Sequence, residues 1–391
     1  MQDTAKIPAV RFEGFTDDWE QRELGEIASI TSGFMGNSLL SDAEYKLTRI
    51  ETIAEGIVDE TRIGFSNIKP DDSFLLKAGD ILYSNINSIS HMGKVAKFEG
   101  KSVLYHGINL LRIAPFDTVL SDFLLQALST ERSRNWAKSH ANQAVSQASI
   151  NQSLLASQKI SICSIKEQQH IGAYFYRLEN LITLHQRKYA KLVNIKKSML
   201  EKMFPKDGAL VPEIRFAGFT DAWERRKVKE LCSIGTGKSN TQDQVDDGKY
   251  PFYIRSDVPV RSNKYLYDCE AVITIGDGNI GRVFHYINGK FDLHQRCYKM
   301  TDFQDIWGKY FFYFFSAKFY DRAMKMTAKA TVDSVRFEMI SEMDIQKPSQ
   351  LSEQQKIAEF FTKLDNLITL HKQKLERLQN IKKSMLEKMF V

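Results

Sequence analysis

Two stretches of this 391-residue chain recur in the same order, and this internal repeat limits the possible folds more than any other feature. VRFEGFTDDWEQRELGEI begins at Val10, and IRFAGFTDAWERRKVKEL begins at Ile214, a shift of 204 residues. A longer stretch, which contains Glu-Gln-Gln and closes on NIKKSMLEKMF, begins at Ile165 and again at Leu351, a shift of 186. The block between the two stretches is therefore 18 residues longer in the first copy. A repeat of this length predicts two units of one architecture.

Each copy contains a variable block that is followed by one long helical stretch. Within the blocks, β-like runs such as AVITIGDG and RVFHYINGK alternate with turn residues, and each block also holds a helical segment, at 122–136 and at 305–326. We therefore predict an α+β fold with mixed domains at 1–163 and 206–349, and with long helices at 164–205 and 350–391.

Apolar residues recur every three or four positions along both long helices, which is typical of a coiled coil. The pattern predicts that the two helices pack against each other. Connectivity favours an antiparallel pair with the two blocks at opposite ends, related by a pseudo-twofold axis. We interpret the two histidines in the pattern as polar residues that set the register. The predicted seam consists of Ile171, Phe175, Leu178, Ile182, His185, Leu192, Ile357, Phe361, Leu364, Ile368, His371 and Leu378.

Composition and charge limit the class of protein. No signal sequence and no apolar stretch of membrane-spanning length is present, so we expect a cytoplasmic protein without a membrane partner. The four cysteines form no CxxC pair, which argues against a zinc site. The formal net charge is +6, but the stretches 165–204 and 351–391 together carry +8. The basic surplus therefore lies in the long helices rather than in the variable blocks.

The sequence contains partial matches to catalytic motifs, but the residues around them do not fit the chemistry. The run Gly276–Gly281 fits GxGxxG, but a hairpin-like sequence follows it instead of the helix that a dinucleotide site requires. Pro70-Asp71 with Glu99 and Lys101 fits a nuclease pattern that short sequences match easily by chance. The Pro-Pro pair of the usual pocket for an extruded adenine is absent. We expect no catalytic residue, no metal site and no bound cofactor, which favours a binding or scaffolding protein.

The two RFxGFTDxWE motifs, together with Glu167-Gln168-Gln169 through Phe204 and Glu353-Gln354-Gln355 through Phe390, closely resemble the specificity subunits of type I restriction-modification systems. This resemblance covers essentially the whole chain. It implies that the variable blocks are target recognition domains for double-stranded DNA and that the paired helices are a conserved spacer. It also implies two methyltransferase subunits as partners, with restriction and translocase subunits joining through them. S-adenosylmethionine, ATP and magnesium are expected in those partners.

Because the two variable blocks differ, the resemblance implies an asymmetric target in two parts. Direct readout favours Arg or Lys toward guanine and Asn or Gln toward adenine, so polar turn residues are the candidates for DNA contact. In the first block these are Ser32, Gly33, Asn37, Ser38, Asn85, Asn87, Ser88, Lys94 and Asn109. In the second block they are Lys238, Ser239, Asn240, Arg255, Arg261, Asp277, Asn279, Arg282, Gln295 and Arg296.

Two other functions remain open from the sequence. One is a stand-alone DNA methyltransferase or endonuclease, which the missing motifs disfavour. The other is a coiled-coil scaffold that does not bind DNA, which salt-dependent binding to a DNA duplex would exclude.

Overall fold

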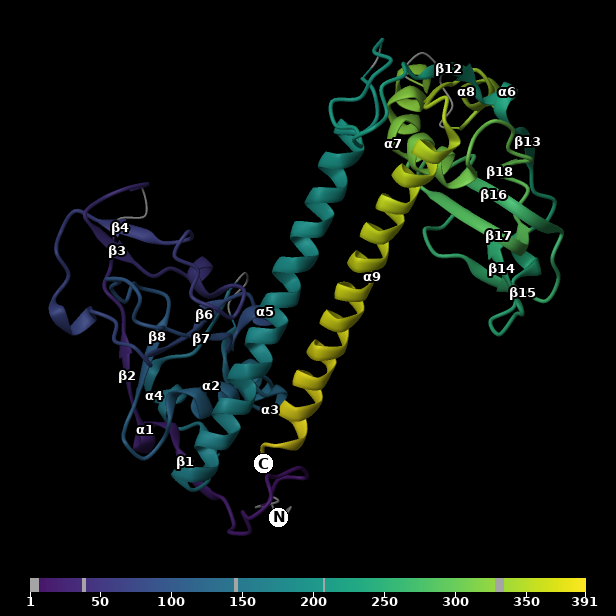
Figure 1. The fold of residues 1–391 in the computed structure, drawn as a ribbon. Helices are drawn as coiled ribbons and strands as arrows, with labels where there is room; N and C mark the ends of the chain where they lie inside the picture. Colours follow the sequence, from purple (N-terminus) through teal and green to yellow (C-terminus); the bar gives the residue numbers. More distant parts are fainter. Residues whose placement is uncertain (1–6, 37–39, 144–146, 207, 328–333) are drawn as a thin grey trace. The chain divides into compact units, whose positions relative to one another are not determined.

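The computed structural model describes residues 7–36, 40–143, 147–206, 208–327 and 334–391. The chain forms two compact units (Figure 1). Unit 1 consists of Met1–Gln186 and Gln373–Val391, and unit 2 consists of Arg187–Lys372. Each of the two long helices contributes residues to both units. No helix in the described ranges is long and apolar enough to cross a membrane.

The central element of unit 1 is a four-stranded antiparallel sheet in the order β2-β8-β5-β7. Alternate residues of β5 serve two cores, as the period of a strand requires. Ile81 and Tyr83 face the core that contains α2, whereas Leu82 faces a second core that contains Phe98. The elements before the long helix are β1 (Glu20–Glu23), α1 (Leu24–Ile27), β2 (Ala28–Ser32), β3 (Tyr45–Leu47), η1 (Ile50–Ile53), β4 (Gly64–Ser66), η2 (Asp72–Phe74), β5 (Ile81–Tyr83), β6 (Ile86–Asn87), η3 (Ile89–His91), β7 (Val95–Lys97), β8 (Leu111–Pro115), α2 (Ser121–Ser129), α3 (Glu131–His140), β9 (Asn142–Gln143), β10 (Ala148–Ser149), α4 (Gln152–Ala156) and β11 (Lys159–Ile162).

Unit 2 has a six-stranded mixed sheet in the order β13-β18-β16-β17-β14-β15. Its strands also serve two cores, since Val272 faces the core that contains α7 while Ile273 faces a separate cluster around Phe291. The elements are β12 (Glu224–Lys227), α6 (Val228–Leu231), β13 (Ser233–Thr236), η4 (Thr241–Asp243), β14 (Tyr250–Tyr253), β15 (Val260–Ser262), β16 (Tyr267–Ile275), β17 (Phe284–Leu293), β18 (Cys297–Thr301), α7 (Gly308–Thr327), α8 (Phe337–Ser341) and β19 (Asp344–Lys347).

The long helices are α5 (Ile165–Lys202) and α9 (Leu351–Lys388). Within unit 1 they run antiparallel, because Phe175 contacts Phe390 while Glu179 pairs with Lys382 at 2.8 Å. Within unit 2 they also run antiparallel, because Phe204 stacks on Phe361 while Lys196 pairs with Asp365 at 2.5 Å. Seam residues near the start of each helix are buried, namely Ile171, Phe175, Leu178, Ile357, Phe361 and Leu364. The later ones are half-buried, namely Ile182, His185, Leu192, Ile368, His371 and Leu378.

The Glu-Gln-Gln motif hydrogen-bonds each long helix to a helix of the preceding block, α2 in unit 1 and α7 in unit 2. In unit 1 the Gln168 carboxamide oxygen accepts a hydrogen bond from the Leu120 amide at 2.8 Å, just before α2 begins. In unit 2 Gln354 does the same for the Trp307 amide at 2.8 Å, just before α7 begins. In both copies this glutamine satisfies one of the amides that the first turn of a helix leaves unpaired. The repeated sequence therefore encodes a repeated contact.

An aromatic side chain at the end of each long helix completes the core of one unit. Phe390 lies 5.4 Å from Phe123 and 5.9 Å from Trp19, between ring centroids, in unit 1. Phe204 lies 5.2 Å from Phe314 and 5.7 Å from Tyr310 in unit 2. Thus α9 completes unit 1 and α5 completes unit 2.

The predicted α+β fold with a pseudo-repeat is confirmed, but the helical segments differ in detail. The segment expected at 122–136 is two helices, α2 and α3, since Thr130 caps α3 by accepting a hydrogen bond from the Ser133 amide. Each block also continues past this helical segment. A short helix follows, α4 or α8, and then a final strand that pairs with the strand at the start of the unit's fold. These pairs are β1 with β11 and β12 with β19.

Candidate nucleic-acid interface

Four loops of unit 2 meet at one edge of its sheet, and we call residues 237–240, 254–256, 276–279 and 294–296 rim 2. Backbone hydrogen bonds join these loops. The Gly276 amide donates to the Arg296 carbonyl at 2.8 Å, and the His294 amide donates to the Tyr253 carbonyl at 2.9 Å. The Gln295 amide donates to the Ser239 carbonyl at 2.9 Å. Residues far apart in sequence are therefore brought together at this edge.

An Asp between two Arg side chains is the principal charged feature of rim 2. Asp277 Oδ2 accepts a hydrogen bond from Arg296 Nη1 at 2.7 Å. Arg255 Nη1 lies 3.3 Å from the same oxygen. Burial alone would raise the pKa of Asp277, but hydrogen bonds and charges from the two guanidinium groups outweigh it, and the pKa is lowered. The carboxylate stays ionised, and the cluster keeps a positive charge that faces solvent.

A buried carboxylate holds the first loop of rim 2. Ser239 is 2% exposed, and its hydroxyl donates to Asp292 Oδ1 at 2.6 Å. The same oxygen accepts a hydrogen bond from the Leu293 amide at 2.9 Å. Ser239 therefore positions the loop rather than facing solvent, while its neighbours Lys238 and Asn240 are exposed.

Unit 1 has an equivalent edge, and we call residues 32–36, 84–88 and 106–109 rim 1. The Phe34 amide donates to the His106 carbonyl at 2.8 Å, and the Ile108 amide donates to the Phe34 carbonyl at 2.9 Å. Asn109 has a left-handed backbone with φ of 70°, a conformation that Asn tolerates better than most residues. Its side chain is half-buried beside a hollow of about 160 Å³ that Arg49 and Glu51 also line.

Both rims depend on a glycine at the same place. A Cβ on Gly33 would lie 2.1 Å from the Gly107 carbonyl oxygen. A Cβ on Gly237 would lie 2.1 Å from the Leu293 carbonyl oxygen. No side chain fits at either position without displacing backbone, so the shared glycine lets two loops approach closely.

A buried histidine within rim 1 is held neutral by its surroundings. His106 is fully buried, and its Nε2 lies 2.9 Å from the Leu110 carbonyl oxygen. Burial lowers the pKa of His106 to about 4, chiefly because a charged imidazole would lose its hydration there. The sequence did not single out His106, or His294 within rim 2, because nothing in the local sequence indicates that either side chain is buried.

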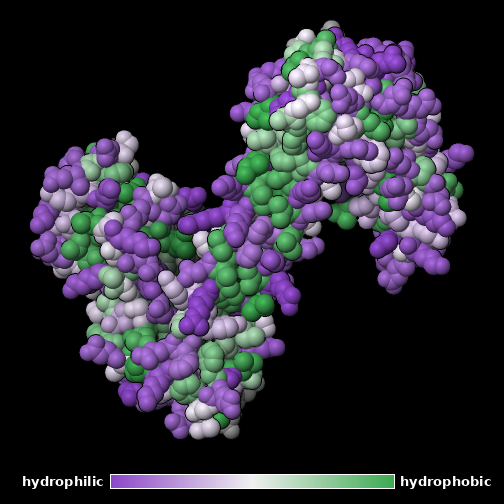
Figure 2. All heavy atoms as spheres, in the orientation of Figure 1, coloured by the Kyte–Doolittle hydropathy of each residue, from purple (hydrophilic) through white to green (hydrophobic). Residues whose placement is uncertain are grey.

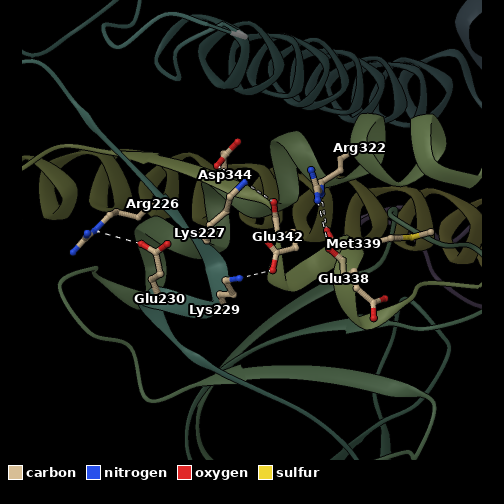
Figure 3. A network of polar contacts seen from close by, with 9 residues as sticks. All are labelled: Arg226, Lys227, Lys229, Glu230, Arg322, Glu338, Met339, Glu342 and Asp344. Atoms are coloured by element: carbon tan, nitrogen blue, oxygen red, sulfur yellow. Dashed lines mark hydrogen bonds and ion pairs between the residues drawn. The ribbon is translucent and has the colours of Figure 1, made fainter.

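The polar network of Figure 3 anchors the short helix α8, which lies directly before β19 in the chain. Arg322 of α7 donates to the Met339 carbonyl at 2.7 Å and to the Glu338 carbonyl at 3.4 Å, so it ties α8 to α7. Lys229 pairs with Glu342 at 2.6 Å and lowers the pKa of that carboxyl.

The residues just before α8 reach rim 2. The Val335 amide donates to the Gly276 carbonyl at 2.7 Å, and Ser334 forms a bridge with Asp277. In unit 1, the Ile150 amide donates to the Asn85 carbonyl at 2.8 Å in the same way. The two rims are therefore built on the same plan.

The predicted contact residues do not all face solvent. Asn85 is 8% exposed, and its side-chain amide donates to the Ile150 carbonyl at 3.0 Å. The Lys94 ammonium donates to the Ala54 carbonyl at 2.7 Å. Arg282 is exposed, although its guanidinium lies over the ring of Tyr320 at 4.3 Å. The exposed ones are Ser32, Ser88, Lys238, Asn240, Arg255, Arg261, Asn279, Arg282, Gln295 and Arg296. Gly33, Asn87, Lys94, Asn109 and Asp277 are half-buried, and Asn37 and Ser38 lie outside the described residues.

Two of the chemical motifs considered in the sequence can be checked against the described residues. Within the described ranges, no group of three or more His, Cys, Asp or Glu side chains is arranged to hold a metal ion. The glycine-rich run at 276–281 forms the turn between β16 and β17, which pair as an antiparallel hairpin. No helix follows it, as the sequence predicted.

The model of the type I restriction modification DNA specificity domain matches the chain twice, at residues 16–194 and 220–380. The chain belongs to this family. The two matches correspond to the two copies of the internal repeat, so the resemblance noted in the sequence is confirmed. Each copy of the DNA specificity domain contains one rim and most of one long helix.

Individual relatives agree with this membership. The chain is 38% identical over 196 residues to a putative type I restriction enzyme MjaX specificity subunit of Methanocaldococcus jannaschii, a match that covers 49% of the chain and 46% of the relative. It is 27% identical over 159 residues to the type I restriction enzyme EcoDI specificity subunit of Escherichia coli, covering 41% and 34%. The matched part thus spans less than half of either curated relative.

A solved structure shows the same fold. The crystal structure of a type I restriction-modification system S subunit from M. genitalium matches with a TM-score of 0.68 and 15% identity, covering 98% of this chain and 99% of that one. The two-domain architecture is therefore shared with a solved S subunit at low sequence identity.

Proposed function

We propose that this chain is the DNA sequence-specificity subunit of a type I restriction-modification complex, and that each unit reads one half of a bipartite target. The observation that carries the proposal is the pair of rims, one in each copy of the DNA specificity domain. Each rim gathers Asn, Ser, Lys or Arg side chains from several loops at one edge of a rigid sheet. Such side chains are the ones that read base edges and contact phosphates.

The two halves of the target differ in this proposal because equivalent rim positions differ. Hydrogen bonds place Asn85 where unit 2 has Gly276, so that Ile86 corresponds to Asp277. Strand pairing of Tyr83 with Leu111, and of Thr274 with Tyr298, makes Asn109 the counterpart of Arg296. An apolar and an amide side chain thus stand where the other rim has a carboxylate and a guanidinium.

The long helices have two roles in the proposed complex. At ~1.5 Å per residue, each 38-residue helix spans ~57 Å, more than one turn of duplex DNA at ~34 Å, so the helices can set a gap between half-sites. They also keep large apolar side chains exposed, and Figure 2 shows hydrophobic side chains among hydrophilic ones where these helices run. These exposed side chains include Tyr176, Leu181, Leu184, Val193, Leu367 and Leu370. Such surfaces suit the docking of two methyltransferase subunits.

The chain performs no chemistry in this proposal. The methyltransferase subunits supply S-adenosylmethionine, and the restriction and translocase subunits that join through them supply ATP and magnesium. The complex acts on double-stranded DNA in the cytoplasm. Because the chain outside the two helical stretches carries a net −2, much of the phosphate attraction comes from the partner subunits.

Methylation mapping tests the proposal. The chain is co-expressed with the methyltransferase encoded beside its gene, and methylated adenines are mapped across the host genome, with the methyltransferase alone as control. A two-part motif with a fixed gap, seen only when the chain is present, is the expected result. A methyltransferase that gives the same motif with and without the chain would contradict the proposal.

A further inference from the structure

The side-chain chemistry of rim 2 points to a particular base. Arg296 is 63% exposed, and the contact that fixes it is its hydrogen bond to Asp277. A guanidinium has five N–H donors in a rigid plane, so one hydrogen bond to a carboxylate leaves donors for a second, bidentate partner. Bidentate contact from Arg to the O6 and N7 atoms of guanine is the commonest specific contact in the major groove.

The carboxylate limits the directions in which Arg296 can point. Asp277 follows the buried end of β16, and its side chain is 18% exposed. Its position is fixed on both sides, because the Gly276 amide donates to the Arg296 carbonyl and Ser334 bridges Asp277. A long side chain held by a fixed anion loses less rotamer entropy when it binds a base.

The backbone of the same loop is also held. The Arg296 amide donates to His294 Nδ1 at 3.1 Å, and His294 is 5% exposed. Arg255 approaches the same carboxylate from the end of β14, at 3.3 Å, and is 49% exposed. The second guanidinium keeps the cluster cationic, which favours the electron-rich edge of guanine.

We propose that Arg296, positioned by Asp277, reads a guanine in the half-site that unit 2 recognises. This inference rests on the proposed function and adds the base and the residue that reads it. Unit 1 lacks the pair, since Asn109 and Ile86 occupy the two positions, so this guanine contact is specific to unit 2.

Mapping of methylated adenines by complexes that carry Arg296→Ala tests the base assignment. We expect one guanine position of a single half-site to become degenerate, with discrimination at that position falling ~10-fold or more, while the other half-site and the gap stay unchanged. Arg226→Ala is the matched control, because Arg226 is an exposed arginine of unit 2 that pairs only weakly with Glu230 at 3.8 Å. A uniform loss of methylation with unchanged sequence preference would overturn the proposal, since it indicates a phosphate contact.

A modified duplex tests the atomic contact. Replacing the assigned guanine by 7-deazaguanine removes the N7 acceptor and leaves base pairing intact. The wild-type complex should methylate this duplex ~10-fold more slowly, and the Arg296→Ala complex should show no further loss. Equal sensitivity of both complexes to the modified base would refute the assignment to Arg296.

The positioning role of Asp277 has its own readout. Asp277→Ala should reduce discrimination at the same base in the wild-type background and change nothing in the Arg296→Ala background, with the melting temperature of the chain unaltered. An equal effect in both backgrounds would overturn the positioning role. Failure of the proposed function is distinguishable, because the wild-type complex would then give no two-part motif at all.

Discussion

The guanidinium of Arg11 binds the buried carboxylate of Glu167 through two hydrogen bonds of 2.7 and 2.8 Å, and Arg215 binds Glu353 with the same two distances. Each pair joins the RFxGFT motif to the Glu-Gln-Gln motif, the two repeated stretches of the sequence. Both glutamates are 1% exposed. The strongest sequence signals in the chain therefore meet in one bidentate ion pair in each unit.

Removing either arginine should destabilise its own unit. Arg215→Ala leaves the carboxylate of Glu353 buried and unpaired, a change that costs about 3 kcal/mol in comparable pairs. The free energy of unfolding, measured by denaturant titration, should fall by that order, and Arg11→Ala should act similarly in unit 1. Arg22→Ala is the control, because its pair with Glu20 is exposed, and we expect a change below about 1 kcal/mol. Similar losses for Arg22→Ala and Arg215→Ala would contradict the role of the buried pair.

Periodic and repeated sequence features predicted the architecture well, because they reflect contacts that are local or recur. The long helices follow from apolar spacing, and the hairpin at Gly276–Gly281 follows from its turn residues. Burial of individual polar side chains did not follow, since it depends on how separate loops meet. Asn85 and Ser239 are both polar turn residues in the sequence, yet their side chains are buried. Asn85 donates to the Ile150 carbonyl, and Ser239 donates to the Asp292 carboxylate. The pairing of Arg296 with Asp277 likewise joins loops 19 residues apart.

The close approach of loops at each rim predicts a strict need for glycine. Gly237→Ala places a Cβ 2.1 Å from a backbone oxygen, so the loops of rim 2 must separate. Methylation of the half-site read by unit 2 should lose sequence preference, and the melting temperature should drop. Gly235→Ala, on the strand that leads into this loop, is the matched control, because the nearest atom to its Cβ is the Lys299 ammonium at 3.7 Å. If Gly235→Ala and Gly237→Ala behave alike in the mapping assay, the steric explanation is wrong.

The neutral state of His106 predicts that unit 1 weakens in mild acid. The pKa of His106 is lowered from 6.5 to about 4 in the folded chain, so the unfolded chain binds more protons between these values and stability falls as pH drops through that range. The loss should approach on the order of 3 kcal/mol near pH 4. Hydrogen exchange resolved by peptide should show faster exchange around residues 104–113 at pH 5 than intrinsic rates explain.

A leucine substitution separates this effect from general acid sensitivity. Leu293 occupies the corresponding place in unit 2, because the Lys238 amide donates to its carbonyl as the Phe34 amide does to His106. His106→Leu should therefore fit and should remove the acid sensitivity of unit 1. An unchanged pH dependence in this variant would assign the sensitivity to other groups.

The aromatic side chains at the ends of the long helices should contribute unequally. Phe204 is 1% exposed and stacks on Phe361, so Phe204→Ala should cost about 3 to 5 kcal/mol of unfolding free energy. Phe390 is half-buried, so Phe390→Ala should cost less, although the ring contacts Trp19 and Phe123. Denaturant titration of the two variants compares them directly. A larger loss of unfolding free energy for Phe390→Ala than for Phe204→Ala would show that side-chain exposure does not predict which of the two contributes more.

The helices should set the distance between the two halves of the target. Inserting one heptad after Lys188 and one after Lys374, which match in the repeat, preserves the apolar pattern and lengthens each helix by ~10 Å. At ~3.4 Å per base pair, the permitted gap should grow by ~3 base pairs while both half-site sequences stay the same. Heptads with apolar residues at the seam positions keep the helices packed, whereas heptads with aspartate at those positions provide a control in which packing is lost. Retention of the original gap by the lengthened complex would show that something other than the helices fixes the distance.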